Sequence, residues 1–136
     1  SERFEKAGID TYKSAVMDLS NPVEGVPGAP FDVIIADVPC TGSGTWARTP
    51  EQLFYFDEAK ISEYASLQRT IIQNALPHLK KGGHLIYITC SVFRQENEEN
   101  VTFIEEELGL TKLSADIIAG YEVRADSMFA SVFRKD

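Results

Sequence analysis

Residues 31–40 read FDVIIADVPC, an apolar run that ends in an acid, a proline and a cysteine. A near-continuous apolar stretch of this length is typical of a strand buried on both faces, so such a strand is predicted over 31–38. A second apolar run, HLIYITC at 84–90, also ends in a cysteine. The chain therefore carries two candidate buried strands, each with a thiol at its end.

A helical pattern separates these two strands. Apolar residues recur at helical spacing from Ile61 to Leu79, and Gln68 is the one polar residue in that series. Pro77 falls in the last predicted turn, and KKGG at 80–83 supplies C-terminal charges and a stop. A strand, a crossover helix and a second strand form a unit in which the strands run parallel and are usually neighbours. An α/β fold with a mostly parallel sheet is therefore predicted.

The rest of the chain predicts shorter elements around this unit. They are the end of a helix at 1–8, a short strand at 12–19 that ends in Asp18, a Pro- and Gly-rich loop at 21–30, a helical turn from Thr49, and a helix at 95–108 with Val101, Ile104 and Leu108 facing inward. Two β-like runs at 121–124 and 128–134 predict an antiparallel pair at the sheet edge.

Size and charge limit the classes of function. The 136 residues, 43% of them hydrophobic, suit one domain over 1–136. No apolar run approaches the roughly 20 residues that span a bilayer, and two cysteines without a disulfide framework suggest free thiols in the cytoplasm. The net charge of −8 argues against a stand-alone nucleic-acid binder. The acidic run QENEEN at 95–100 is interpreted as a solvated helix face.

Cys40 and Cys90 are the candidate reactive residues. Parallel neighbouring strands lie about 4.8 Å apart and end at the same edge, so both sulfurs are expected in the crevice beyond the strand ends, beside Asp37. A buried cysteine is often only a small hydrophobe, but each of these stands at a strand end and is followed by small or polar residues. A disulfide between them is disfavoured by the expected compartment.

Other chemistries fit the spacing less well. A phosphatase loop needs Arg six residues after the cysteine, where this chain has Trp46. His78 and His84 form no metal-ligand spacing with either cysteine, so no metal is expected. The GSG at 42–44 lacks the further residues of a nucleotide-binding fingerprint.

The ordered motifs resemble those of the RNA cytosine-C5 methyltransferases of the NOL1/NOP2/Sun type, the group of the bacterial rRNA enzyme Sun/Fmu. They are DVPCTGSG at 37–44, RTP at 48–50, KGG at 81–83, TCS at 89–91 and ENE at 96–98. The resemblance implies a Rossmann-like sheet that uses S-adenosylmethionine to methylate a cytosine in rRNA or tRNA. The RNA is then the expected partner, and no membrane partner is expected.

The same resemblance implies roles for single residues. Cys90 matches the nucleophile that adds to cytosine C6, and Cys40 matches the cysteine assigned to product release. Asp37 matches the acid that contacts the target base and the donor, and Asp18 matches the acid at the adenine end of the donor. Pro39 and Arg48, beside these motifs, are expected to contact substrate.

The resemblance also implies missing parts. A family catalytic domain begins with a strand and a Gly-rich donor loop, followed by a second strand, and residue 1 corresponds to a point after both. The chain is thus expected to be an N-terminally truncated domain with an incomplete donor site, inactive alone, whose RNA-binding flanking domains belong to the longer protein. The alternative hypothesis is a non-catalytic RNA-processing scaffold or subunit module.

Overall fold

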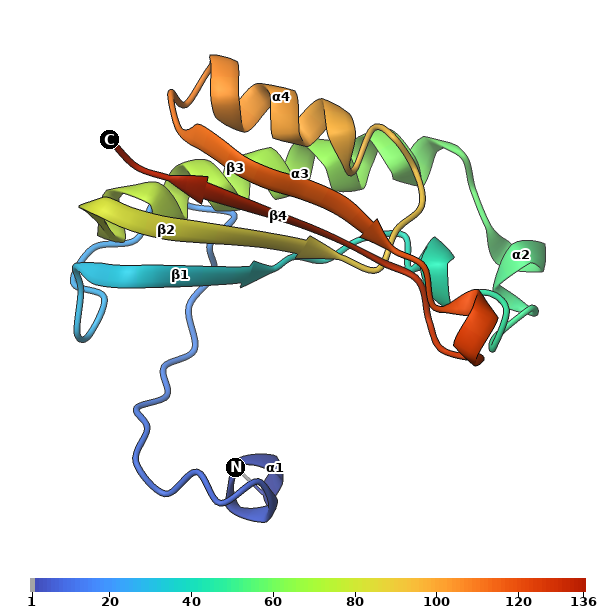
Figure 1. Ribbon diagram of the computed structural model, residues 1–136, viewed down its shortest axis with the longest axis horizontal. Helices are drawn as coiled ribbons and strands as arrows, with labels where there is room; N and C mark the ends of the chain where they lie inside the picture. Colours follow the sequence, from blue (N-terminus) through green and yellow to red (C-terminus); the bar gives the residue numbers. More distant parts are fainter. Residues whose placement is uncertain (1) are drawn as a thin grey trace.

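A parallel pair of strands forms the centre of the sheet. The structure is a computed structural model that describes residues 2–136 (Figure 1). In it β1 (Phe31–Asp37) pairs in parallel with β2 (Leu79–Thr89), with Asp37 opposite Ile88. The predicted crossover between neighbouring parallel strands is confirmed.

The C-terminal part of the chain completes the sheet as an antiparallel hairpin. β3 (Thr111–Ile118) pairs with β4 (Met128–Arg134), and β4 pairs with β2, which yields the order β1-β2-β4-β3. The predicted mixed α/β sheet with an antiparallel C-terminal edge is confirmed. The partner predicted for β4 at 121–124 is wrong, because Tyr121–Val123 forms a 3-10 turn, η3, inside the connection between β3 and β4. The side chains of β3 are all exposed, and its strand signal is the alternation of Leu113, Ala115 and Ile117 with polar residues, not a continuous apolar run.

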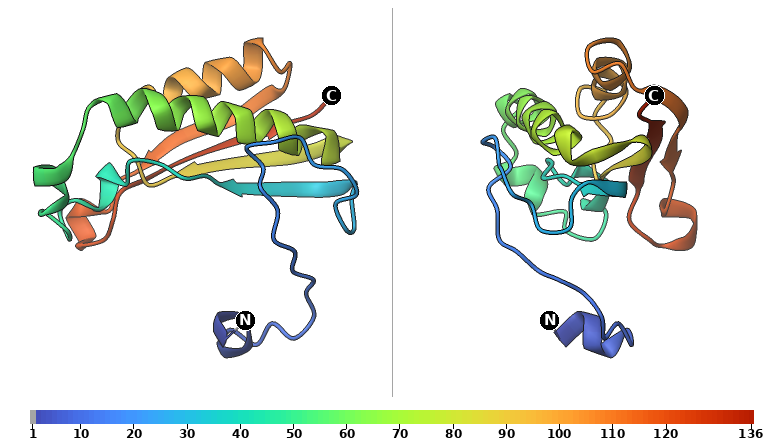
Figure 2. Two further views of the ribbon diagram at one scale, coloured as in Figure 1. Left: turned by 180° about the vertical axis from the view of Figure 1, so that it is seen from behind. Right: turned by 90° about the vertical axis from the view of Figure 1, so that its left-hand side faces the viewer.

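Two helices cover one face of the sheet. α3 (Ala59–Ala75) and α4 (Glu98–Glu106) lie on the same side of the strands, in Figure 1 and in the views of Figure 2. The core between them and the sheet consists of Val38, Ile72, Leu79, Leu85, Tyr87, Val101, Ile104, Leu110, Phe129 and Phe133. The helix α3 ends earlier than predicted, because the chain changes to a 3-10 turn, η2 (Leu76–His78), around Pro77, which has no N–H to continue the helix.

No helix formed by residues 2–136 covers the opposite face of the sheet. In β1, Ile34 packs against the core, whereas Val33 and Ile35 are 49% and 65% exposed. The prediction that 31–38 is buried on both faces is therefore wrong for this chain. Successive side chains of a strand point to opposite faces, and only one face has helices packed on it.

The N-terminal segment lies outside the sheet. α1 (Glu2–Lys6) covers part of the helix end predicted at 1–8, and Ser1 lies outside the described residues. Residues 12–19 form no strand, and α1 and the chain that follows it extend away from the sheet (Figure 1). The prediction of a strand there is wrong, since a strand needs a backbone partner and β1 pairs only with β2 among the described residues. α2 (Gln52–Tyr55) and a 3-10 turn, η1 (Ser43–Thr45), lie beyond the carboxyl end of β1.

Candidate active site

The two cysteines meet beyond the carboxyl ends of the parallel strands. Cys90 directly follows β2, and Cys40 stands three positions after the end of β1. Both are half-buried free thiols, and their sulfur atoms lie 3.2 Å apart, within hydrogen-bonding distance. The predicted convergence of the two sulfurs on one point is confirmed.

Burial sets the protonation state of the Cys40 thiol. Burial raises the pKa of the Cys40 thiol to about 12, and the contact with the Cys90 sulfur adds to the rise. Cys40 therefore keeps its proton at neutral pH. It is placed to donate that proton in a hydrogen bond to the Cys90 sulfur.

A buried carboxylate lies between the two segments that carry the cysteines. Glu96 has no exposed surface and accepts hydrogen bonds from the backbone N–H of Thr41 at 3.0 Å and its hydroxyl at 2.6 Å. It also accepts one from the hydroxyl of Ser91. Thr41 follows Cys40 and Ser91 follows Cys90, so one side chain joins the neighbours of both thiols.

Further buried polar residues support this carboxylate. The amide nitrogen of Gln68, on α3, donates to Glu96 at 3.0 Å and to the carbonyl of Pro39 at 2.9 Å. The hydroxyl of Tyr87 lies 2.6 Å from the carbonyl oxygen of Glu96, and Asn100 donates to Gln68 at 2.7 Å. Burial raises the pKa of Tyr87, which keeps this hydroxyl protonated. The groups form one connected network under the cysteines.

The acidic run at 95–100 is only partly a solvated face. Glu96, Asn97 and Asn100 are buried, whereas Glu98 and Glu99 are exposed. The sequence interpretation missed the three buried members because it treated the run as one charge block. The available signal was Gln68, a polar residue in an apolar helix series, since a buried polar side chain requires a partner.

Gly44 brings a third segment against the site. Its N–H donates to the Cys90 carbonyl at 2.8 Å, and its own carbonyl accepts from the N–H of Ser127 at 3.0 Å. A Cβ at this position would lie 2.1 Å from the Ser127 carbonyl oxygen. The glycine thus permits close packing of the backbone beside Cys90.

The two aspartates assigned to the donor by resemblance share one cavity. Asp18 and Asp37 line a groove of about 540 Å³ together with Met17, Ile34, Ala36 and Leu67, among others. Hydrogen bonds from Ser20 and Asn21 lower the pKa of Asp18. The groove has two carboxylates on an otherwise largely apolar wall.

The two predicted substrate residues, Pro39 and Arg48, have different surroundings. Pro39 is exposed, precedes Cys40 and lines the groove that contains Asp18 and Asp37. The guanidinium of Arg48 forms two hydrogen bonds to the Asp126 carboxylate, at 2.8 Å and 3.2 Å, and its side chain is 67% exposed. This ion pair lowers the pKa of Asp126.

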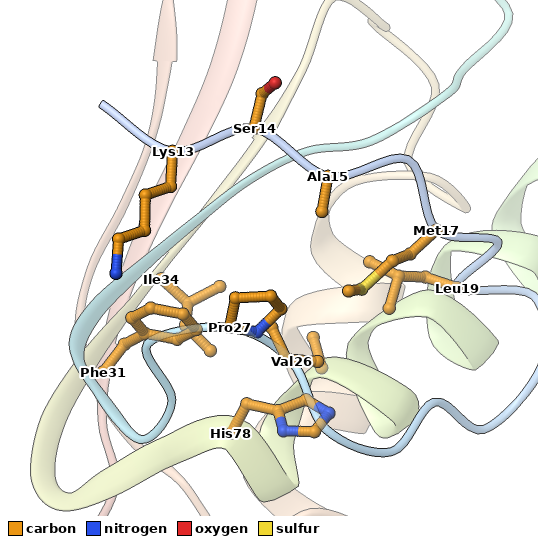
Figure 3. A pocket seen from close by; sticks show the side chains of 11 residues that line it. Lys13, Ser14, Ala15, Met17, Leu19, Val26, Pro27, Phe31, Ile34 and His78 are labelled. Carbon is orange, nitrogen blue, oxygen red and sulfur yellow. The ribbon is translucent and has the colours of Figure 1, made fainter. Parts of the chain in front are cut away.

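A second cavity, of about 350 Å³, lies beside the start of β1 and contains none of the predicted site residues. It is lined by Lys13, Met17, Phe31 and His78, among others (Figure 3). The Nε2 atom of His78 is buried there without a hydrogen-bond partner.

Two classes of feature are not found in the described part of the chain. Residues 2–136 contain no group of three or more His, Cys, Asp or Glu side chains that is able to hold a metal ion. Within the same residues, no helix has the length and apolar character needed to cross a membrane.

Comparison with known proteins relates the chain to rRNA methyltransferases. The family model described as 16S rRNA methyltransferase RsmB/F matches residues 2–122. The chain is 45% identical over 69 residues to the ribosomal RNA small subunit methyltransferase F of Shewanella loihica, which covers 51% of this chain and 14% of that protein. It is 32% identical over 106 residues to the probable ribosomal RNA small subunit methyltransferase B of Bacillus subtilis, over 77% of this chain and 24% of that protein.

A solved structure supports the fold. The crystal structure of NSun6 from Pyrococcus horikoshii with SFG superimposes on 98% of this chain and 37% of its own, with a TM-score of 0.81 and 24% identity. The chain spans only part of the two curated relatives described above: 14% of the length of the first and 24% of the length of the second.

Proposed function

Since the chain belongs to the 16S rRNA methyltransferase RsmB/F family, we propose that it carries the cysteine site of an RNA methyltransferase that uses S-adenosylmethionine to methylate C5 of a cytosine. The observation that supports this most directly is the pair of sulfur atoms 3.2 Å apart at the ends of two parallel strands. The curated relatives above are named as ribosomal RNA methyltransferases, which makes rRNA the first RNA to test.

Cys90 is the proposed nucleophile. Its thiolate adds to C6 of the cytosine, so an Sγ–C6 bond forms and the electron pair of the C5=C6 bond becomes available at C5. Covalent addition of this kind divides one difficult step into two easier ones. The hydrogen bond available from the protonated Cys40 stabilises the Cys90 thiolate before it adds.

Cys40 is the proposed release residue. Methyl transfer to C5 leaves S-adenosylhomocysteine behind. A water molecule then takes the C5 proton, the electron pair of the C5–H bond re-forms the C5=C6 bond, and the Sγ–C6 bond breaks. The departing Cys90 sulfur takes up negative charge, and the Cys40 S–H is positioned to donate a hydrogen bond to it. Asp37, exposed at the end of β1, is proposed to hydrogen-bond the amino edge of the base, with Pro39 and Arg48 contacting the surrounding RNA.

The groove that contains Asp18 and Asp37 fits part of the donor. S-adenosylmethionine supplies the methyl group as an electrophile. The largely apolar wall suits an adenine ring, and the two carboxylates supply hydrogen-bond acceptors for it and its neighbouring groups. We propose that residues outside this chain complete the donor site and supply RNA-binding domains, and that the 136 residues alone do not transfer methyl groups.

Variants of the two cysteines in the whole protein test the function. With S-adenosylmethionine and rRNA present, Cys90→Ala is expected to abolish 5-methylcytosine formation. Cys40→Ala is expected to accumulate a covalent protein–RNA adduct that survives denaturing gel electrophoresis. Undiminished methylation by the Cys90 variant, with unfolding at the same temperature as the parent, would refute the assignment.

A further inference from the structure

We propose that Glu96 is the positioning residue of the cysteine site. Its carboxylate joins the first cysteine loop, residues 38–45, to the second cysteine loop, residues 90–97. In this way it holds the two thiols at their close separation. The importance of Glu96 for catalysis rests on the proposed function. Its role in holding the two loops together does not.

The contacts of Glu96 reach both loops next to the thiols. One oxygen, Oε1, accepts from the Thr41 backbone N–H and from Gln68, each at 3.0 Å. The other, Oε2, accepts from the hydroxyls of Thr41 and Ser91. Only one peptide unit separates Thr41 from Cys40 and Ser91 from Cys90, so a displacement of either partner moves a thiol.

Each oxygen of the Glu96 carboxyl group has two hydrogen-bond partners. Four donor groups face the carboxylate, and an ionised carboxylate accepts from all of them, whereas a glutamine presents an NH₂ group in place of one oxygen. Within residues 2–136 no Lys, Arg or His forms an ion pair with Glu96. Hydrogen bonds alone therefore satisfy the buried carboxyl group of Glu96, which makes the arrangement sensitive to the loss of each donor.

Other contacts also join the two loops. The hydroxyls of Thr41 and Ser91 lie 3.3 Å apart, and those of Ser43 and Ser91 lie 3.2 Å apart. The Val92 N–H donates to the Ser43 hydroxyl at 2.9 Å, and the Gly44 N–H donates to the Cys90 carbonyl at 2.8 Å. These contacts remain when Glu96 is changed. Loss of the carboxylate is thus expected to loosen the thiol pair without separating the loops.

The test measures how readily the two thiols pair in the folded chain. In a glutathione buffer, two cysteine thiols and one oxidised glutathione exchange to one Cys40–Cys90 disulfide and two reduced glutathiones. The equilibrium constant of this exchange has units of concentration. It is the effective concentration of one cysteine thiol at the other, and it rises as the two are held closer to the geometry of a disulfide. Mass spectrometry of alkylated samples quantifies the reduced and oxidised chains, and neither donor nor RNA is needed.

Glu96→Gln is the test variant and Glu98→Gln the matched control. Glu98 is two positions along the same acidic run but exposed, so its variant removes the same charge without touching either loop. Glu96→Gln is expected to lower the effective concentration roughly tenfold, which corresponds to about 1.4 kcal/mol or one to two hydrogen bonds. The control is expected to stay within about twofold of the parent, a few tenths of a kcal/mol, as for most surface substitutions.

A purely structural role makes a different prediction. A Glu96→Gln chain that unfolds at a lower temperature but keeps the parental effective concentration would overturn the proposal. If that variant does not fold, Thr41→Val removes one hydroxyl contact to Oε2 and retains the backbone N–H, and an unchanged effective concentration in it would also overturn the proposal. Because the readout involves no methylation, its result is separate from that of the Cys90→Ala assay.

Discussion

Replacing Gly44 by alanine tests whether close backbone packing beside Cys90 stabilises the site. The added Cβ would lie 2.1 Å from the Ser127 carbonyl oxygen and 2.9 Å from the Cys90 carbonyl oxygen. Ordinary contacts between such atoms are about 3.5 Å, so the segments must move apart by about 1 Å or more. Both neighbours are backbone atoms, which have no alternative rotamer to adopt.

The energetic cost follows from the contacts that this movement breaks. Gly44 makes two backbone hydrogen bonds here, to Cys90 at 2.8 Å and from Ser127 at 3.0 Å. Losing both costs about 2 kcal/mol, and residual overpacking adds about 1 kcal/mol or more. At about 3 to 4 °C per kcal/mol for a domain of this size, the midpoint of thermal unfolding is expected to fall by about 10 °C.

Gly25→Ala is the matched control. Gly25 has φ +67° in an exposed loop, and a Cβ there meets nothing within 4 Å. Alanine at position 25 is expected to lower the free energy of unfolding by about 1 kcal/mol, the cost of a left-handed backbone conformation for a residue with a Cβ. The unfolding midpoint is then expected to fall by about 3 °C. Calorimetric scans of both variants check the difference, and a Gly44→Ala midpoint no lower than that of Gly25→Ala would refute the packing argument.

Two further predictions concern Cys40 and the donor. Because burial raises the pKa of Cys40 to about 12, its contribution to stability is fully present below the ordinary cysteine pKa of 9.0 and is lost as pH rises from there toward 12. The unfolding temperature of the Cys40→Ala variant is thus expected to fall less than that of the parent chain between pH 9 and about 11. An equal fall in both chains would contradict the assignment of this loss of stability to Cys40. Isothermal calorimetry of the 136-residue chain with S-adenosylmethionine is expected to show no micromolar binding, and tight binding would show that the groove at Asp18 suffices.

The sequence predicted the centre of the fold because its signals are local and strong. The apolar runs at 31–38 and 84–90, with a helical series between them, led to a parallel pair with both thiols at one edge, as observed. The hairpin was partly misread. β3 was missed although Leu113, Ala115 and Ile117 alternate with polar residues, which is a strand pattern. Its side chains are all exposed, so the strand lacks the buried apolar run by which β1 and β2 were predicted.

The errors at β1 and at residues 12–19 have a common cause. The described residues supply neither a layer on the second face of β1 nor a partner strand for 12–19, a segment whose usual neighbouring strands the family resemblance already implied to be missing. An apolar pattern indicates that a segment is suited to burial. The pattern does not identify the segment that packs on the strand, so the exposure of Ile35 was not predictable from the sequence of β1 alone.

The arrangement of the thiols separates into a part set by topology and a part set by side chains. Strand pairing alone brings Cys40 and Cys90 to within roughly one strand spacing, about 4.8 Å, and this much follows from the sequence pattern. The observed sulfur separation of 3.2 Å is shorter, and it coincides with a buried carboxylate that binds the residue after each cysteine. An apolar filler at position 96 would preserve the strand pairing but would leave the buried donors of Thr41 and Ser91 without their acceptor. With the positioning role proposed for Glu96, the contact between the thiols depends on its hydrogen bonds to Thr41 and Ser91, which are 55 and 5 positions from it in the chain.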